Sequence, residues 1–205
     1  MVAFACVIYK RELVRCTTMT SRARCIIVTG RPGSGKTTLA RELSKSLHMP
    51  MLSRDLIKEG YVSTFGVSHD RLPSDTNRRV TNLFFSTARS LLEGNVSVVV
   101  EAAFQHRVWQ ETIPAWSIAG DPCFIICEAD PTLCAQRHLG RGLMDPTREF
   151  YHGDKRVKVF RETGEFRGPG DYSPPSFDLP TLRVVTTDGY SPELAAIRDF
   201  ATGRP

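Results

Sequence analysis

Short apolar runs alternate along the chain with longer amphipathic segments. Residues 25–29, 96–100 and 122–127 are almost continuously hydrophobic, as expected of strands that are buried on both faces. Apolar residues in the intervening segments recur three or four positions apart, which predicts helices. The helices predicted in this way cover residues 36–48, 75–93, 107–119 and 131–141. Strands that alternate with helices indicate an α/β protein with a parallel sheet and helices on both faces.

Shorter elements complete this pattern. Met51-Leu52 predicts a brief strand that ends at Ser53-Arg54-Asp55, and residues 182–186 predict a last strand. Residues 65–74 are polar and contain glycine, so we expect a loop over the site. Residues 142–180 are rich in Arg, Lys, Gly and Pro, which indicates an insertion between a lid and the last strand. Short helices are predicted at 55–61, 154–161 and 192–201.

The helical spacing also predicts which side chains face the core. In the first long helix, the residues on one face are Leu39, Leu43 and Leu47. In the second, the residues at core spacing are Val80, Leu83, Phe84, Ala88 and Leu91. Pro50 and Gly94-Asn95 end these two helices.

The chain divides into a short N-terminal segment and one domain. We expect residues 1–22 to be a flexible appendage, with Met19 as a candidate start; the alternative is an extra edge strand from Phe4 to Tyr9. This segment lacks a long apolar core and a small-residue cleavage site, so it does not resemble a secretory signal. Residues 23–205 suit a single domain, with a lid at about 137–160.

The turn after the first predicted strand carries the clearest motif. Gly30-Arg31-Pro32-Gly33-Ser34-Gly35-Lys36-Thr37 satisfies G-x-x-x-x-G-K-[ST] and lies between a strand and a helix, the context expected of a P-loop. Gly33 and Gly35 let the backbone curl, so that N–H groups and the helix N-terminus face phosphate oxygens. Lys36 is placed to reach the β- and γ-phosphates of ATP, and Thr37 to bind Mg²⁺. The candidate nucleotide-binding residues here are Gly30, Arg31, Pro32, Gly33, Ser34, Gly35, Lys36, Thr37 and Thr38.

Other features narrow the class of P-loop protein. The chain contains no N-K-x-D-like guanine motif, and it is too short for the helical lid domain of a large AAA+ machine. We therefore favour a small kinase that uses ATP and Mg²⁺.

Composition adds little beyond this. With 41% hydrophobic and 24% charged residues the chain is typical of a globular protein, and either ATP or a nucleic acid would account for its net charge of +5. No apolar stretch approaches the ~18 residues of a membrane span. The six cysteines include no C-x-x-C pair. We expect a cytoplasmic protein with reduced thiols and no membrane partner.

Asp55 follows the second predicted strand. Ligands gather at the carboxyl ends of parallel strands, so its carboxylate is expected in the same crevice as Lys36. There it would orient an attacking hydroxyl and later accept the proton. Lys58, one helical turn on, is a candidate for holding an anionic substrate. The alternative is that Asp55 simply caps its helix.

Glu101 directly follows the third predicted strand. An acid at the end of an apolar strand occupies the Walker-B position, where it would bind Mg²⁺ through water or contact the substrate. Arg107 lies just beyond and is a candidate substrate-binding residue. A solvated surface arginine is an equally good interpretation.

Arg137 and Arg141 are spaced i, i+4 on the helix after the fourth predicted strand, so they share one face. Guanidinium groups suit phosphate oxygens, and a lid here would exclude water from the transfer. The alternative is a solvated basic helix end. Arg148 is a weaker lid candidate. Neither His69-Asp70-Arg71 nor His152-Gly153-Asp154 is assigned a function.

These segments together resemble a known family, the small P-loop kinases often described as AAA-domain ATP-binding proteins. Named members that this chain resembles are polynucleotide 5′-kinase domains, zeta toxins and chloramphenicol phosphotransferase. The segments that carry the resemblance are Gly30–Thr37, Ser53-Arg54-Asp55, Lys58, Val98-Val99-Val100-Glu101-Ala102, Arg137 and Arg141.

The resemblance covers roughly residues 24–201 and implies a nucleoside-monophosphate-kinase-like fold. It implies a three-layer P-loop NTPase fold, a five-stranded parallel sheet in the order 2-3-1-4-5, and a lid. It also implies that Asp55 activates the acceptor, that Arg137 and Arg141 are lid arginines, and that the loop ending at Tyr190 lies beside adenine. Polynucleotide kinases tend to carry Arg where this chain has Lys58, and Asp where it has Glu101.

Three functions remain open at this point. The favoured one is an ATP-dependent kinase that phosphorylates a hydroxyl of a small molecule, such as a metabolite, an antibiotic or a nucleotide-like compound. The second is a polynucleotide 5′-hydroxyl kinase, which predicts a basic channel with aromatic residues for base stacking. The third is a nucleotide-switched ATP-binding protein without an acceptor, in which Asp55 is not needed. We expect a monomer or a homodimer.

Overall fold

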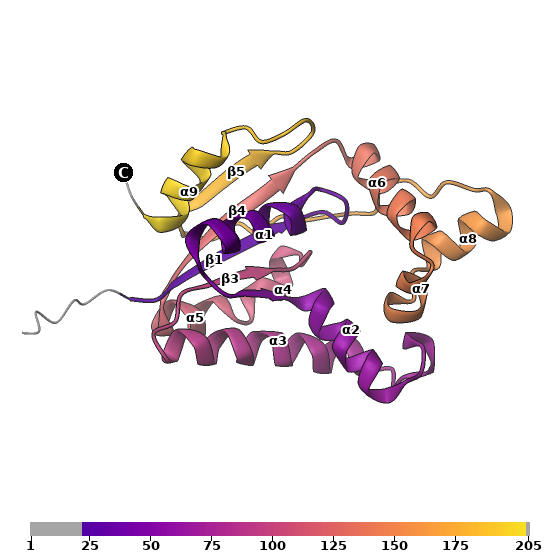
Figure 1. Cartoon of the computed structure of the whole chain (residues 1–205), viewed down its shortest axis with the longest axis horizontal. Coiled ribbons are helices and arrows are strands. Elements are labelled where there is room, and N and C mark those ends of the chain that lie inside the picture. The colour runs from indigo at the N-terminus through magenta and orange to yellow at the C-terminus, as the bar shows by residue number, and fades with distance from the viewer. Residues whose placement is uncertain (1–21, 204–205) are drawn as a thin grey trace, which may run out of the picture.

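The computed structural model describes residues 22–203, which form a single parallel sheet with helices on both faces (Figure 1). The strand order is β2-β3-β1-β4-β5, and each neighbouring pair is parallel. This confirms the predicted fold class and strand order. The strands are β1 Arg24–Gly30, β2 Met51–Ser53, β3 Val98–Glu101, β4 Asp121–Glu128 and β5 Thr181–Val185.

The predicted N-terminal appendage, residues 1–22, lies outside the described residues except for Arg22, and so does the alternative edge strand from Phe4 to Tyr9.

Most helices lie close to their predicted positions. The helices are α1 Lys36–Leu47, α2 Arg54–Phe65, α3 Thr76–Glu93, α4 His106–Gln110, α5 Ile113–Ala119, α6 Pro131–Met144, α7 Thr147–His152, α8 Lys155–Thr163 and α9 Leu194–Thr202, with a 3₁₀ turn η1 at His69–Arg71.

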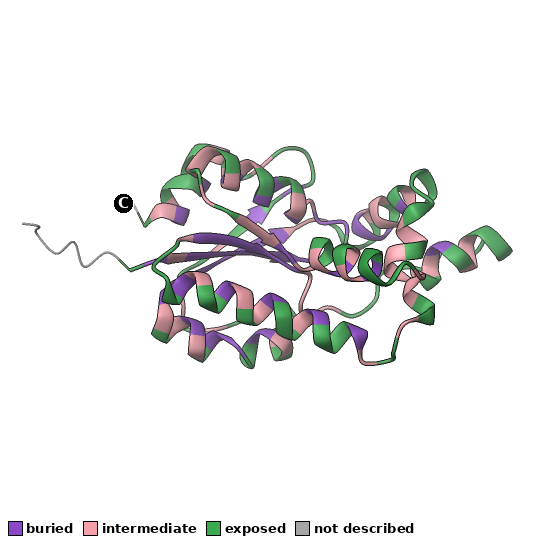
Figure 2. Cartoon of the chain, turned by 60° about the horizontal axis from the view of Figure 1, so that its bottom comes forward, coloured by how far each residue is buried: buried purple, intermediate pink, exposed green. Residues whose placement is uncertain are grey.

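Alternating strand residues build two cores, one on each face of the sheet. In β1, Ile26 and Val28 pack in one cluster with residues of α1 and α9. Cys25 and Ile27 belong to the other cluster, with residues of α3, α4 and α5. Figure 2 shows the buried strands between helices whose outer sides are exposed. The continuous apolar runs in the sequence are therefore explained by burial on both faces.

Aromatic rings fill the core beneath α3. Phe84 is fully buried, and its ring centroid lies 5.6 to 6.4 Å from those of Phe85, Phe104, Trp109 and Trp116. These tilted and edge-to-face arrangements are the favourable geometries for aromatic pairs.

The prediction that Leu83 faces this core is wrong, because 49% of its surface is exposed. Leu91 is only partly buried, whereas Leu92 is 2% exposed. The helix presents every fourth residue to the sheet, so the buried set is Thr76, Val80, Phe84, Ala88 and Leu92.

The single helix predicted over 107–119 is two short helices. α4 ends at Gln110, and α5 starts at Ile113, with Pro114 in its first turn. A proline inside a continuous helix would lack an N–H donor and would clash with the carbonyl four residues before it. The chain therefore breaks where Pro114 can occupy a helix start.

The insertion after α6 contains one helix more than predicted, because α7 precedes α8. Asp154 caps α8 by accepting a hydrogen bond from the Arg156 N–H, and its carboxylate lies 2.5 Å from His138 Nε2 on α6. Gly142 allows α6 and α8 to pack closely, since a Cβ there would lie 2.4 Å from a methyl group of Val157. These contacts join α6 and α8, which with α7 occupy one end of the molecule (Figure 1).

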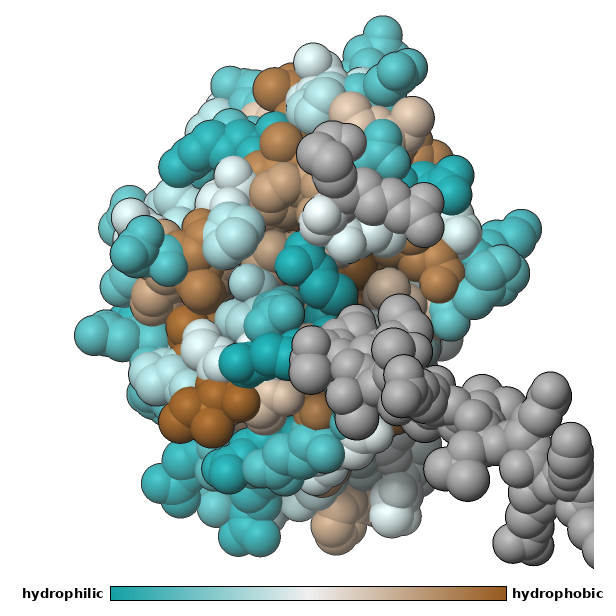
Figure 3. All heavy atoms as spheres, turned by 90° about the vertical axis from the view of Figure 1, so that its left-hand side faces the viewer, coloured by the Kyte–Doolittle hydropathy of each residue, from teal (hydrophilic) through white to brown (hydrophobic). Residues whose placement is uncertain are grey.

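At the opposite end of the molecule, neither polar nor apolar residues dominate the surface. Figure 3 views this end, where hydrophilic and hydrophobic residues are interspersed around the grey atoms. Within residues 22–203, no helix combines the length and apolar character needed to cross a membrane.

Phe84→Ala is expected to lower the free energy of unfolding by about 3–5 kcal/mol, because it leaves a cavity among four aromatic rings. The control is Leu83→Ala, at the adjacent position on the same helix, which should lower the free energy of unfolding by about 0.5 kcal/mol or less. Urea unfolding followed by circular dichroism measures both. Equal losses for the two variants would contradict the burial described here.

Candidate active site

A cavity of about 730 Å³ lies at the carboxyl ends of the strands, between α1, α2 and the lid helices α6 to α8. Parallel sheets place binding sites at this edge. The cavity brings together many of the residues that the sequence selects, which come from five separate elements. The selected residues that line it are Pro32, Lys36, Thr37, Thr38, Asp55, Lys58, Glu101, Arg141 and Arg148.

The phosphate loop has the backbone shape that the motif predicts. Gly33 and Gly35 have φ angles of +90° and +80°, in the left-handed region. A Cβ on Gly33 would lie 2.0 Å from the carbonyl oxygen of Cys134. Among the described residues, the backbone N–H groups of Gly33, Gly35, Lys36 and Thr37 donate to no protein acceptor. Such unpaired donors at the start of α1 fit phosphate oxygens.

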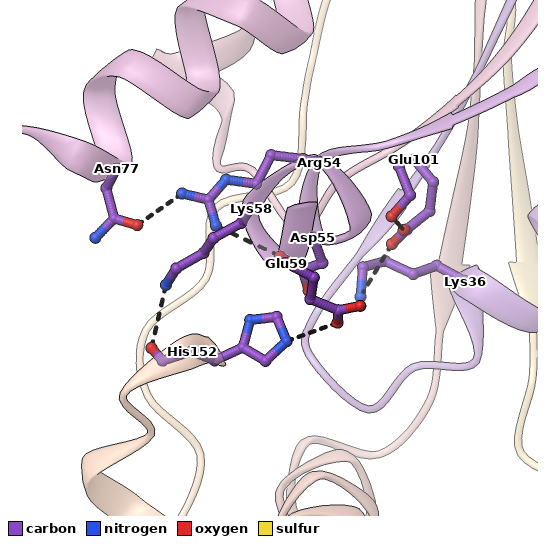
Figure 4. Close-up of polar contacts among 9 residues, drawn as sticks. Lys36, Arg54, Asp55, Lys58, Glu59, Asn77, Glu101 and His152 are labelled. Carbon is purple, nitrogen blue, oxygen red and sulfur yellow. Dashed lines mark hydrogen bonds and ion pairs between the residues drawn. The ribbon is translucent and has the colours of Figure 1, made fainter. Parts of the chain in front are cut away.

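Lys36 and Glu101 form a buried ion pair in the cavity wall. Lys36 Nζ lies 3.4 Å from Glu101 Oε1, and Ser53 Oγ donates to Glu101 Oε2 at 2.8 Å (Figure 4). The three residues come from α1, β2 and β3; β2 and β3 are neighbours in the sheet, and α1 packs against both. A bound phosphate would compete with Glu101 for Lys36.

The oxygen ligands near the loop fit Mg²⁺. The hydroxyl of Thr37 and the carboxylate of Glu101 line the same cavity, and oxygen ligands suit this hard cation. No group of three or more His, Cys, Asp and Glu residues that could hold a metal occurs in residues 22–203. Mg²⁺ in such a site takes most of its ligands from phosphate and water.

Asp55 lies in the first turn of α2, with 55% of its side chain exposed. Burial acts to raise its pKa, but the proximity of His152, Lys36 and Arg54 outweighs burial, so the pKa of Asp55 lies below its ordinary value. The carboxylate is therefore ionised at neutral pH and can accept a hydrogen bond from a hydroxyl.

The sequence missed how α7 of the lid contacts α2. His152 Nε2 lies 2.9 Å from Glu59 Oε1, and Lys58 Nζ donates to the His152 carbonyl at 3.1 Å (Figure 4). Arg54 donates to Asn77 Oδ1 on α3 at 2.8 Å. Lys58 and His152 are 94 positions apart, so local patterns carry no signal of this contact. The only sequence feature that pointed to this region was the polar segment His152-Gly153-Asp154, to which we assigned no function.

The two predicted lid arginines have different surroundings. Arg141 lines the cavity, where burial and then the neighbouring Arg148 lower its pKa. Arg137 instead donates to the backbone carbonyls of Thr186, at 3.1 Å, and Thr187, at 2.6 Å. Arg137 therefore joins α6 to the loop after β5.

Two further candidates also lie away from the cavity lining. Arg107 is exposed on α4. Tyr190 packs against the core on the α1 side, where burial and then Glu42 raise its pKa to about 12. The loop it belongs to still reaches the phosphate loop, because Thr186 Oγ1 donates to the Ser34 carbonyl at 2.7 Å.

Arg31, in the phosphate loop, contacts the extended segment before β5. Its guanidinium donates to the Gly170 carbonyl at 2.5 Å and lies 5.4 Å from the ring centre of Tyr172. The Tyr172 hydroxyl is 3.5 Å from Thr29 Oγ1 at the end of β1. The segment around Tyr172 therefore borders the phosphate loop at Arg31.

Comparisons with known proteins agree with this geometry. Residues 25–160 match the AAA domain family. A cytidylate kinase from Pyrobaculum aerophilum is 31% identical over 81 residues, which cover 35% of this chain and 44% of that protein. The match therefore spans less than half of the curated relative.

Solved structures share the fold. A candidate kinase from Chloroflexus aurantiacus J-10-fl superposes with a TM-score of 0.71 and 27% identity, over 90% of this chain and 99% of that one. The Mycobacterium tuberculosis APS kinase CysC, solved with AMPPNP and APS, gives a TM-score of 0.58 at 16% identity, over 89% and 99% of the two chains. A chain of the Pnkp1/Rnl/Hen1 RNA repair complex gives a TM-score of 0.53 at 18% identity, over 75% of this chain and 50% of that chain. The last two likenesses show the fold alone.

Gly33→Ala is expected to abolish binding of a non-hydrolysable ATP analogue and to lower the melting temperature. The added methyl group would meet the Cys134 carbonyl at 2.0 Å, at a φ angle that alanine rarely adopts. Gly60→Ala in α2 is the control, because a Cβ there meets nothing within 4 Å. It should stabilise the protein by about 0.5–1 kcal/mol. Thermal unfolding with and without the analogue and Mg²⁺ tests both; retained binding by Gly33→Ala would contradict the loop geometry.

Proposed function

The chain belongs to the AAA domain family of P-loop proteins, and on that premise we propose that it is an ATP-dependent kinase for a hydroxyl of a small molecule. One observation carries the proposal. Lys36, Asp55 and Arg141, from three separate helices, line one cavity of about 730 Å³. A phosphate-binding lysine, a carboxylate and a lid arginine around one space are the groups that phosphoryl transfer needs.

In the proposed reaction the acceptor oxygen attacks the γ-phosphorus of ATP. The new O–P bond forms as the bond to the bridging oxygen breaks, and the electron pair of that bond leaves with ADP. Asp55 orients the hydroxyl and takes its proton late, when the oxygen has become acidic. Its lowered pKa makes Asp55 a weak base before transfer, so it orients the hydroxyl first and takes the proton only as the O–P bond forms.

The phosphate loop and the lid stabilise the transferred group. Lys36 would leave Glu101 to bind the β- and γ-phosphates, while Arg141 approaches from α6. Thr37, and Glu101 through water, would hold Mg²⁺, which when bound neutralises charge on the phosphates. We assign Arg137 a positioning role, since its contacts hold α6 against the loop after β5.

The cavity favours a small acceptor over a polynucleotide. Its volume is within the range of small-molecule sites, roughly 300–1,000 Å³. Within the described residues, no Phe, Tyr or Trp lines it, whereas a single-stranded nucleic acid would be expected to stack on such side chains. A nucleotide switch without an acceptor gives no reason for Asp55 to face the phosphate loop.

Lys36→Ala is expected to abolish phosphoryl transfer and to weaken ATP binding, because the loop loses its only lysine. Transfer is measured with γ-labelled ATP and a panel of hydroxyl compounds. Lys45→Ala, an exposed lysine in the last turn of α1, is the control and should leave activity unchanged. Circular dichroism checks folding, since the buried carboxylate of Glu101 loses its cationic partner in the variant. Full activity of a folded Lys36→Ala would rule the mechanism out.

Asp55→Asn is expected to lower the rate of transfer by about 10²–10⁴-fold, the usual contribution of a general base, while affinity for an ATP analogue is retained. The amide keeps the shape of the side chain but cannot take the proton. The control is Asp199→Asn, an exposed position on α9. Unchanged turnover of an identified acceptor by Asp55→Asn would show that this carboxylate is not involved.

A further inference from the structure

The cavity carries more positive charge than its own carboxylates balance. Eight lysine and arginine side chains line it, against four carboxylates. All four of these carboxylates already contact a partner: Glu101 pairs with Lys36, Asp55 with Arg54, Glu59 with His152, and Asp154 with His138. ATP with Mg²⁺ carries a net charge of about −2, so its binding would leave cations without counter-charge.

Lys58 shows this imbalance most clearly. It is 4% exposed, and its ammonium group donates to a backbone carbonyl, that of His152. Within residues 22–203, no carboxylate oxygen lies within 4 Å of its Nζ. Burial, and then the neighbouring Arg54, lower the pKa of Lys58 to about 8, against the smaller opposing effects of Asp55 and Asp70. A buried ammonium without an anionic partner is costly, so an anion from outside the chain would stabilise it.

Two arginines line the same cavity as Lys58. Arg54 donates to Asn77 and contacts Asp55 at 3.4 Å, but its buried Nε has no hydrogen-bond partner among the described residues. Arg148, from α7, lines the same cavity, and its guanidinium forms no ion pair or hydrogen bond within the part of the chain described. Arg54, Lys58 and Arg148 therefore present unused donors from α2 and the lid.

These cations are placed to serve the acceptor rather than ATP. The phosphate loop and Lys36 lie at the start of α1, whereas Arg54 and Lys58 flank Asp55 on α2. Lys58 is three residues after Asp55, so the two side chains are neighbours on one helix face, with Cβ atoms ~5–6 Å apart. A ligand that contacts both would carry its hydroxyl and its charge only a few bonds apart.

We propose, on the basis of the kinase function above, that the acceptor is a small alcohol that already bears a phosphate monoester. Its phosphate binds Lys58 and Arg148, with Arg54 at the edge, while its free hydroxyl contacts Asp55. A phosphate dianion balances two or more cations, and guanidinium groups match its oxygens in a bidentate manner. A single carboxylate would leave more of this charge unbalanced.

Paired acceptors test the proposal. Hydroxyl compounds, their phosphate monoesters and their carboxylate analogues are compared with γ-labelled ATP as donor. The phosphate esters should have a kcat/KM at least ~10-fold higher than the parent compounds. Lys58→Gln should lower this kcat/KM ~10–100-fold, mainly through KM, and leave the KM for ATP unchanged. Lys58→Arg should recover part of the lost kcat/KM. The control is Lys158→Gln, at an exposed lid position, which should have the kcat/KM of the wild type.

A binding measurement separates this proposal from the kinase function. The full chain is saturated with a non-hydrolysable ATP analogue and Mg²⁺ and titrated with inorganic phosphate, followed by ³¹P NMR. Phosphate should bind beside the analogue in wild type and ~10–100-fold more weakly in Lys58→Gln. Phosphate binding without turnover of any acceptor would support the anion subsite and contradict the kinase function. Turnover of neutral or carboxylate acceptors at least as fast as phosphate esters, or full activity in Lys58→Gln, would overturn the subsite and leave the kinase function standing.

Discussion

The close approach of the phosphate loop to the start of α6 constrains the rest of the site. Gly33 lies against the carbonyl of Cys134, and the Thr186 hydroxyl binds the Ser34 carbonyl from the other side. These contacts hold the loop between β1, α6 and the end of β5, while the N–H groups of Gly33, Gly35, Lys36 and Thr37 have no protein acceptor among residues 22–203. Donors fixed in advance in this way need no rearrangement when an anion binds.

The buried pair of Lys36 and Glu101 connects this loop to the rest of the cavity. A buried ion pair contributes little net stability, because desolvation offsets the attraction between the charges. An incoming phosphate would replace Glu101 as the anionic partner of Lys36, so the ammonium group would stay paired when this ion pair opens. Ser53 would continue to hold Glu101, whose carboxylate then becomes free for water bound to Mg²⁺.

The acceptor side of the cavity depends on a contact between α2 and the lid. His152 and its carbonyl meet Glu59 and Lys58, so α7 lies against the helix that carries Asp55. This contact buries Lys58 and brings Arg148 into the same cavity. Charge complementarity for the acceptor would thus exist when the lid is in this position, which couples recognition of the acceptor to exclusion of water.

The sequence by itself determined the sheet, most of the helices and the phosphate loop, because these follow from periodicity and from a motif whose spacing is local. It also indicated that Asp55, Lys58 and Glu101 face one crevice, since parallel strands end at one edge. The exposure of Leu83, the carbonyl contacts of Arg137 and the contacts of Arg54 and His152 were decided by the tertiary structure alone. Each of them depends on which distant backbone or side chain lies opposite, and spacing along the chain carries no information about that partner.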